Sequence, residues 1–259
     1  MNDIQKHPSV VVVGCVHGDE RVGERVIRRF EDFKIRKGSL RTVLANEWAY
    51  RAGCRFIDAD LNRSFPGCKD GNHEERLACE LADDLSSADY VVDIHSTTTD
   101  TEGVAFIARI DRPVVELVKL LSPRRVVLVQ PEFASRALIG HVRAGVSLEY
   151  GRDDDPVAQE RIISSILSML DTLEMTESER VKVGSSPEYY RIVGTIPKGV
   201  GFHAHRSVRN FRFVRMGDAL ASDGEAELKA ERDFYPVLFG EEAYPDIFGF
   251  MAERFDPEF

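Results

Sequence analysis

The sequence predicts an α/β protein built around one largely parallel sheet with helices on both faces. Short β-rich runs alternate with amphipathic segments over the first 175 residues, which is the pattern of consecutive βα units. Three of the apolar runs end in residues that commonly carry chemistry. After residue 175 the alternation stops and a polar stretch leads into a β-rich C-terminal part. We therefore expect two domains, residues 1–175 and residues 188–259.

The strands of the first domain are predicted from short runs rich in β-branched residues. The first strand is expected at residues 10–13, and later strands are expected at residues 41–45, 91–94, 104–107, 126–129 and 146–148. If they belong to one parallel sheet, their carboxyl ends share an edge, and this is where open α/β folds bind ligands.

The helices are predicted from apolar residues that recur every three or four positions. This spacing occurs at residues 19–33, 74–85, 113–121 and 156–173. The third of these segments opens with Pro113, and proline is tolerated in the first turn of a helix.

The C-terminal part is expected to be a small, mostly β domain. Residues 174–187 are polar and end in Gly-Ser-Ser-Pro, a composition that is typical of turns and loops. Residues 189–196 and 211–215 have strand-like composition. We expect the chain to close with a helical tail at residues 244–254.

Composition and charge restrict the class of protein. The chain has 259 residues, of which 43% are hydrophobic and 30% charged, and a net charge of −10. This acidic balance argues against a nucleic-acid or anionic-membrane partner. The first nine residues contain no apolar signal-peptide core, and no run of about 18 apolar residues occurs. A cytoplasmic protein is therefore expected, and its four cysteines, which form no C-x-x-C pair, are expected to be free thiols.

His17, Glu20 and His95 are the candidate metal ligands, and Glu149 is the candidate base. His17 and Glu20 follow the first apolar run, while His95 and Glu149 each end another. Two imidazoles and a carboxylate form the ligand set of zinc hydrolases that keep one position for water. Each residue alone has an ordinary reading, as a helix-start histidine, a core histidine or a strand-end glutamate facing water. Their coincidence at three strand ends favours the metal site.

Residues 55–67, R-F-I-D-A-D-L-N-R-S-F-P-G, contain a candidate substrate-binding pair. The alternative interpretation is a loop with exposed charges. However, the adjacent Asn62 and Arg63 offer an amide and a forked guanidinium, which together suit a carboxylate.

Four motifs together resemble the succinylglutamate desuccinylase and aspartoacylase family, a branch of the zinc carboxypeptidase superfamily. They are G-C-V-H-G-D-E at 14–20, the segment at 55–67, D-I-H-S at 93–96 and S-L-E-Y-G at 147–151. The resemblance implies a mixed, largely parallel, zinc carboxypeptidase-like sheet and a small C-terminal domain that completes the pocket. It also implies one Zn²⁺ per chain, held by His17, Glu20 and His95.

The resemblance further implies a role for each remaining candidate. Glu149 would be the general acid/base, Arg55 would polarise the scissile carbonyl, Asn62 and Arg63 would bind the substrate's α-carboxylate, Tyr244 would reach the pocket from the C-terminal domain, and Asp60 would orient a ligating histidine.

The chain departs from the family pattern at one point. Aspartoacylase has a further arginine shortly before the catalytic glutamate, which grips the substrate's side-chain carboxylate. Here Arg136 and Arg143 are both candidates, and Ile139 lies nearest the expected register. Specificity for an acidic side chain is therefore left open.

The expected function is zinc-dependent hydrolysis of the amide bond of an N-acyl amino acid or a similar small carboxylate-bearing amide. One alternative is a zinc carboxypeptidase acting on short peptides, which would use the same residues in a more open pocket. A non-catalytic zinc-binding module is the other, although pure binding requires neither Glu149 nor Arg55. The expected partner is this small molecule, and assembly into a homo-oligomer is left open. His203 and His205 are assigned to a polar loop rather than to a second metal site.

Overall fold

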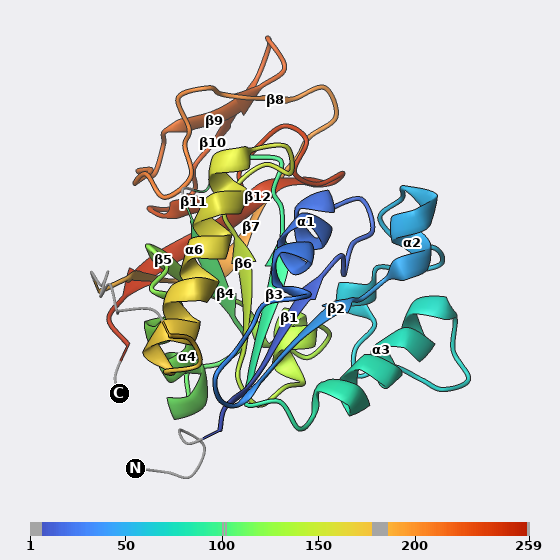
Figure 1. Cartoon of the computed structure of the whole chain (residues 1–259). Helices are drawn as coiled ribbons and strands as arrows, with labels where there is room; N and C mark the ends of the chain where they lie inside the picture. Colours follow the sequence, from blue (N-terminus) through green and yellow to red (C-terminus); the bar gives the residue numbers. More distant parts are fainter. Residues whose placement is uncertain (1–6, 100, 102, 178–185, 258–259) are drawn as a thin grey trace.

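A mixed sheet of nine strands runs through the described part of the chain in the computed structural model, which covers residues 7–99, 101, 103–177 and 186–257 (Figure 1). In spatial order its strands are β11 (Tyr235–Val237), β12 (Ile247–Phe255), β7 (Glu188–Pro197), β5 (Arg125–Leu128), β4 (Val104–Ile107), β6 (Gly145–Glu149), β3 (Tyr90–His95), β1 (Ser9–Gly14) and β2 (Ser39–Leu44).

The strands that carry or directly precede the candidate metal ligands and Glu149 are neighbours and run in the same direction. β1, β3 and β6 are parallel, with Gly14 beside Ile94 and His95 beside Glu149. Their carboxyl ends therefore meet at one edge, which confirms the expectation that rested on the three apolar runs. β4 runs antiparallel to β6 and parallel to β5, so the sheet is mixed, and the predicted fold class is confirmed.

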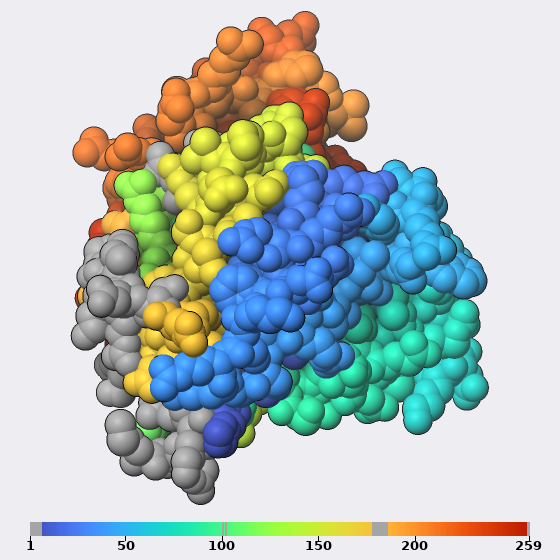
Figure 2. Space-filling view, viewed as in Figure 1, coloured from blue at the N-terminus to red at the C-terminus, as the bar shows by residue number. Residues whose placement is uncertain are grey.

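Helices cover both faces of the sheet. Helices α1 (Arg21–Phe30), α4 (Arg112–Leu121) and α6 (Pro156–Thr172) pack on one face, and α3 (His73–Leu85) packs on the other. Alternate valines of β1 point to the two sides, since Val10 and Val12 belong to the first core and Val11 and Val13 to the second. In the space-filling view α1 and α6 lie side by side over the sheet (Figure 2). None of the described helices is long and apolar enough to cross a membrane.

Two shorter helices, α2 (Glu47–Ala52) and α5 (Pro131–Ala134), follow β2 and β5 in the chain. Asn46 caps α2, because its side chain accepts a hydrogen bond from the Ala49 N–H. A capping box formed by Asn72 and Glu75 begins α3. Such caps satisfy backbone donors that the first helical turn leaves unpaired, so these helices begin where the sequence supplies the capping residue.

The C-terminal strands β7, β12 and β11 continue the main sheet. A separate antiparallel sheet contains β8 (His203–Ala204), β9 (Ala219–Ser222) and β10 (Glu227–Lys229), at the top of Figure 1. How these parts divide into domains stays a prediction.

The prediction of a helical tail at residues 244–254 is wrong, because this segment contains most of strand β12. Phe248, Phe250 and Ala252 are buried at every second position, which is the period of a strand. β12 pairs with β7 and β11 on its two sides, so it is a central element of the C-terminal region.

The strand expected at residues 211–215 is also absent from the described structure as a continuous element. Only an isolated bridge between Val214 and Phe234 forms there. Phe211 has a φ of 59°, which lies in the left-handed region and interrupts an extended chain.

Candidate metal centre and active site

A tight turn between β1 and α1 presents the first two candidate ligands. The backbone turns at Cys15, whose φ is 56°. Gly18 then lies so close to α2 that a Cβ atom there would come within 2.2 Å of the carbonyl carbon of Ala49. Its N–H donates to the carbonyl of Arg55 at 3.0 Å. Glycine at this position therefore lets the ligand turn pack against the segment that carries Arg55.

His17, Glu20 and His95 form a buried cluster. His17 Nδ1 lies 2.7 Å from Glu20 Oε1, and His95 Nδ1 lies 3.0 Å from Glu20 Oε2. One ligand atom from each residue lies within 4.8 Å of the others. Two imidazole nitrogens and a carboxylate converging in a buried place are a donor set that suits Zn²⁺, so the residues fit the metal that the sequence predicts.

The far side of each imidazole faces a carboxylate. His17 Nε2 lies 3.1 Å from Asp60 Oδ1, and His95 Nε2 lies 2.7 Å from the buried Asp93. A ring that donates its Nε2–H to a carboxylate leaves the Nδ1 lone pair for a metal. Arg55 Nη2 also lies 3.0 Å from His17 Nε2, but the tautomer that binds a metal through Nδ1 is the one that donates to Asp60.

The charges within the cluster are strongly coupled. Burial lowers the pKa of His95, but the carboxylates of Asp93 and Glu20 outweigh burial and hold this pKa well above its usual range. Burial acts to raise the pKa of Glu20, whereas His17 and His95 hold it well below its usual range. The cluster thus stabilises positive charge between its ligand atoms, and this is the place that a divalent cation would occupy.

Glu149 lies at the end of β6, beside His95 in the sheet register. Burial raises the pKa of Glu149 to about 7, with a further contribution from Glu20. A carboxyl group with a pKa near 7 can both accept and return a proton at neutral pH. The thiol of Cys15, by contrast, has a pKa raised to about 12 by burial, which makes it a poor nucleophile.

One cavity of about 670 Å³ brings together all the residues that the sequence predicts for the site. Its lining contains His17, Glu20, Arg55, Asn62, Arg63, His95, Glu149 and Tyr244. Their individual roles stay predictions.

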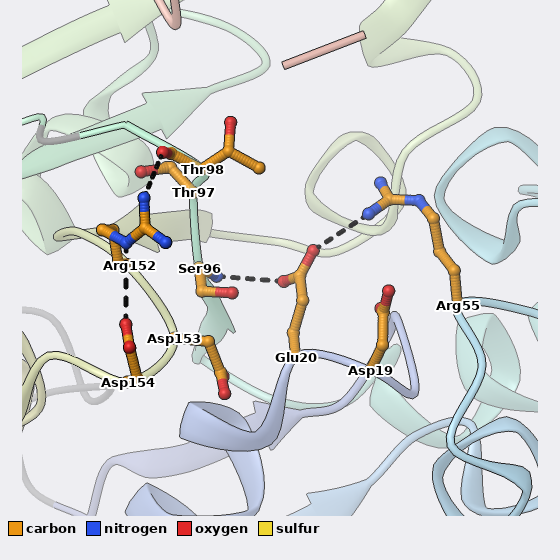
Figure 3. A pocket seen from close by; sticks show the side chains of 9 residues that line it. All are labelled: Asp19, Glu20, Arg55, Ser96, Thr97, Thr98, Arg152, Asp153 and Asp154. Atoms are coloured by element: carbon orange, nitrogen blue, oxygen red, sulfur yellow. Dashed lines mark hydrogen bonds and ion pairs between the residues drawn. The ribbon is translucent and has the colours of Figure 1, made fainter. Parts of the chain in front are cut away.

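Arg55 lies beside the metal cluster, with its Nη1 3.2 Å from Glu20 Oε1. Figure 3 shows the Glu20 carboxylate between this guanidinium and the backbone N–H of Ser96, which donates to Glu20 at 3.0 Å. The side chain of Arg55 is 43% exposed, so it can reach a molecule bound in the cavity. A smaller hollow of about 330 Å³ adjoins this place and contains Thr97, Thr98 and Arg152 in its lining (Figure 3).

Asn62 and Arg63 belong to a short 3-10 turn, Leu61–Arg63. The Oδ1 atom of Asn62 accepts from the Leu138 N–H at 3.0 Å, which orients the amide. The guanidinium of Arg63 lies 4.7 Å from the ring centre of Phe133, a cation–π distance. Both side chains are therefore held at the wall of the cavity by apolar or backbone partners.

Tyr244 enters the cavity from the loop that precedes β12. Its ring packs edge-on against Phe250, with ring centres 5.3 Å apart. Burial raises the pKa of the Tyr244 hydroxyl, and the charge of Glu149 adds to this. The hydroxyl is therefore protonated and can donate a hydrogen bond.

Neither arginine that the sequence left open lines the cavity. Arg136 is exposed and donates to the backbone carbonyl of Arg63 at 2.8 Å. Arg143 precedes β6 and lies 3.8 Å from Asp89, at the opposite end of that strand from Glu149. Ile139, the residue nearest the expected register, does line the cavity.

Ile139 is part of an apolar wall that sequence reasoning missed. Its residues are Phe106, Val129, Phe133, Ala137, Ile139, Ile192, Leu238 and Phe250. They come from separate segments between β4 and β12, and each looks like an ordinary core residue in the sequence. Only the unusual position of Ile139 gave a signal.

His203 and His205 take no part in the described site. Neither lines the cavity or belongs to the metal cluster. The His203 side chain is 80% exposed and lies 3.3 Å from Glu241.

The chain is similar to known proteins in sequence and in fold. A model of the succinylglutamate desuccinylase/aspartoacylase catalytic domain matches residues 6–174. A probable aspartoacylase of Nostoc sp. is 27% identical, over 94% of this chain and 94% of its own length. An N-acyl-aromatic-L-amino acid amidohydrolase of Xenopus tropicalis is 25% identical, over 91% of this chain and 88% of its own length. The crystal structure of murine aminoacylase 3 superposes with a TM-score of 0.81 at 23% identity, covering 96% of this chain and 95% of that one.

Proposed function

The chain belongs to the succinylglutamate desuccinylase/aspartoacylase family, and from this premise we propose that it is a zinc hydrolase that removes the acyl group from N-acyl amino acids. The observation that carries the proposal is the buried cluster of His17, Glu20 and His95, which opens into the same cavity as Glu149 and Arg55. A site that only stored a metal would need neither of the last two residues.

Bound by His17, Glu20 and His95, Zn²⁺ would supply a Lewis acid that lowers the pKa of water and polarises the scissile carbonyl. Glu149 takes the proton from the attacking water and returns it to the leaving amine nitrogen, for which a pKa of about 7 is well placed. Arg55 donates hydrogen bonds to the carbonyl oxygen as negative charge develops there.

Asn62 and Arg63 hold the α-carboxylate of the substrate. The guanidinium provides two parallel donors, and the amide NH₂ of Asn62 provides a third. Tyr244, which also lines the cavity, adds a hydroxyl donor. These contacts fix the amide bond relative to Glu149 and Arg55, and such positioning accounts for a large part of catalysis.

The apolar wall favours a substrate whose amino-acid side chain is aromatic or large and aliphatic. Burying such a side chain contributes about 2–3 kcal/mol, whereas a carboxylate buried there without a partner is strongly disfavoured. Ile139 lies nearest the position at which the family pattern has an arginine for an acidic side chain. The Xenopus relative is named for aromatic N-acyl amino acids, which suit an apolar wall. The Nostoc relative is named as a probable aspartoacylase, whose acidic substrate would not suit it.

The test is a substrate panel with the zinc-loaded protein, with release of free amine as the readout. The panel contains N-acetyl-L-phenylalanine, N-acetyl-L-aspartate, N-succinyl-L-glutamate and a short dipeptide. We expect kcat/KM to be highest for the phenylalanine derivative, by about tenfold or more over the aspartate derivative. The Glu149→Gln variant, purified in parallel, controls for contaminating hydrolases. Preference for the dipeptide would replace the proposal with a carboxypeptidase, and preference for the acidic substrates would overturn the assignment of the apolar wall.

A further inference from the structure

Glu74 is a fully buried carboxylate that the proposed chemistry does not use. It is the second residue of α3, and its side chain is 0% exposed. Its Oε1 atom accepts from the N–H of Ile57 at 2.7 Å and from Asn46 Nδ2 at 3.0 Å. The Oε2 atom accepts from the N–H groups of Asp58 and Ala59, at 2.9 and 3.1 Å. Buried carboxylates are rare unless they are fully paired, so this one has a definite structural task.

The segment that Glu74 holds connects the proposed catalytic arginine with the proposed carboxylate-binding pair. Residues 54–60 form neither helix nor strand, so the N–H groups of residues 57–59 have no ladder or helix partner. Arg55 lies two residues before Ile57, and Asp60, Asn62 and Arg63 follow Ala59. Asp58 returns the contact, since its Oδ2 atom accepts from the His73 N–H at 3.0 Å.

Only an ionised carboxylate suits this set of donors. Burial acts to raise the pKa of Glu74, but the backbone and Asn46 hydrogen bonds outweigh it and hold the pKa below its usual range. A carboxylate offers about four acceptor positions, which matches the donors named above. A glutamine would accept at one oxygen and would turn an NH₂ group toward backbone N–H groups, so the segment would have to move.

We propose that Glu74 is a positioning residue, which fixes residues 57–59 from the side of α3 and thereby sets the separation between Arg55 and the Asn62–Arg63 pair. This inference rests on the proposed function for its catalytic consequence. Glu74 would affect the binding of both ends of the substrate, because Arg55 contacts the scissile carbonyl and Arg63 contacts the α-carboxylate.

The matched test compares Glu74→Gln with Glu75→Gln. Glu75 is the next residue of the same helix, and its carboxylate accepts from the Asn72 N–H in the capping box without touching residues 57–59. Three quantities are measured on each zinc-loaded protein: zinc content, hydrogen exchange of the peptide that spans residues 55–63, and the kinetics of N-acetyl-L-phenylalanine hydrolysis.

We expect Glu74→Gln to keep its zinc, to exchange the 57–59 amides faster, and to lose between about tenfold and 100-fold in kcat/KM, because small displacements in a site are costly. Both a higher KM and a lower kcat are expected, since both arginines are displaced. Glu75→Gln keeps an oxygen that can accept from Asn72 in the capping box, so it should leave exchange at 57–59 and kcat/KM unchanged. If Glu74→Gln fails to fold, Glu74→Asp is measured instead, because it keeps the charge and withdraws it by one methylene.

Equal kcat/KM in the two variants, measured well below their melting temperatures, would overturn the role of Glu74 while leaving the proposed function intact. Unchanged exchange at 57–59 in Glu74→Gln would overturn it as well. If the wild-type protein hydrolyses none of the N-acyl amino acids, the proposed function fails, and the exchange measurement alone then decides whether Glu74 holds the segment.

Discussion

Glu149 owes its expected reactivity to its place at the end of β6. The position leaves it partly exposed to the cavity, yet burial and the Glu20 carboxylate raise its pKa to about 7. We predict that Glu149→Gln keeps its zinc, because the ligands are untouched, and loses activity by about 10²–10⁴-fold, because the proton acceptor is gone. Elemental analysis and amine release measure the two quantities. Turnover close to the wild-type value would show that Glu149 is not the base.

Arg63 is expected to act through the shape of its guanidinium as well as through its charge. Lysine keeps the charge but cannot form two parallel hydrogen bonds to a carboxylate. We predict that Arg63→Lys lowers kcat/KM for N-acetyl-L-phenylalanine by an amount equivalent to about 1.5–3 kcal/mol of lost transition-state stabilisation. The corresponding amide substrate, which lacks the α-carboxylate, serves as the control and should show little loss. Equal losses on both substrates would assign Arg63 another task.

Tyr244 combines packing with a polar group, and one substitution separates the two. Tyr244→Phe keeps the ring against Phe250, whose centre lies 5.3 Å away, so the melting temperature should barely change. Zinc content should stay full while activity on the best substrate falls, because one donor to the substrate carboxylate is lost. Full activity in this variant would reduce Tyr244 to a packing residue.

At the scale of single elements, strands β1 and β3, which precede or carry the candidate metal ligands, were predictable from local sequence. Each is a short apolar run with candidate ligands at or just after its end, and the run needs no distant partner to be recognised. β12 was not predictable in this way. Its residues 248, 250 and 252 are buried because β7 and β11 flank the strand, and a short apolar segment is compatible with a buried helix as well. Tertiary pairing therefore decided its conformation.

The contact between α3 and the segment at residues 57–59 should also make stability depend on pH. The pKa of Glu74 is lower in the folded protein than its ordinary value, so its contribution is present above about pH 4.3, the unfolded value, and is lost as pH falls through the folded pKa. At pH 7 we expect Glu74→Gln to reduce the free energy of unfolding by about 1.5–3 kcal/mol. At about pH 3, below the unfolded value, the difference should be smaller, because the carboxyl group of the unfolded wild-type chain then binds a proton that folded Glu74 binds less readily.

Urea unfolding of the wild type and Glu74→Gln at the two pH values measures this difference. A free-energy difference that stays constant, or grows as the pH falls, would mean that the charge of Glu74 does not stabilise the fold.

At the scale of the whole molecule, the site divides into a part that sequence motifs reveal and a part that they do not. The metal cluster and its neighbours lie in compact motifs of fewer than about 15 residues, within which spacing restricts geometry. The apolar wall is assembled from residues as far apart as Phe106 and Phe250. None of them differs in kind from a core residue, so only the folded chain shows that they face the cavity. The proposed preference for an apolar substrate therefore rests on the fold and not on a sequence motif.

Amide hydrolysis by this protein is expected to require one zinc ion at the His17–Glu20–His95 cluster. The most direct measurement is a zinc titration of chelator-treated protein, followed by the rate of amine release from N-acetyl-L-phenylalanine. We predict that activity is lost on chelation and rises linearly until one equivalent of zinc per chain has been added. Activity that survives chelation, or that appears only with a second equivalent, would contradict this account.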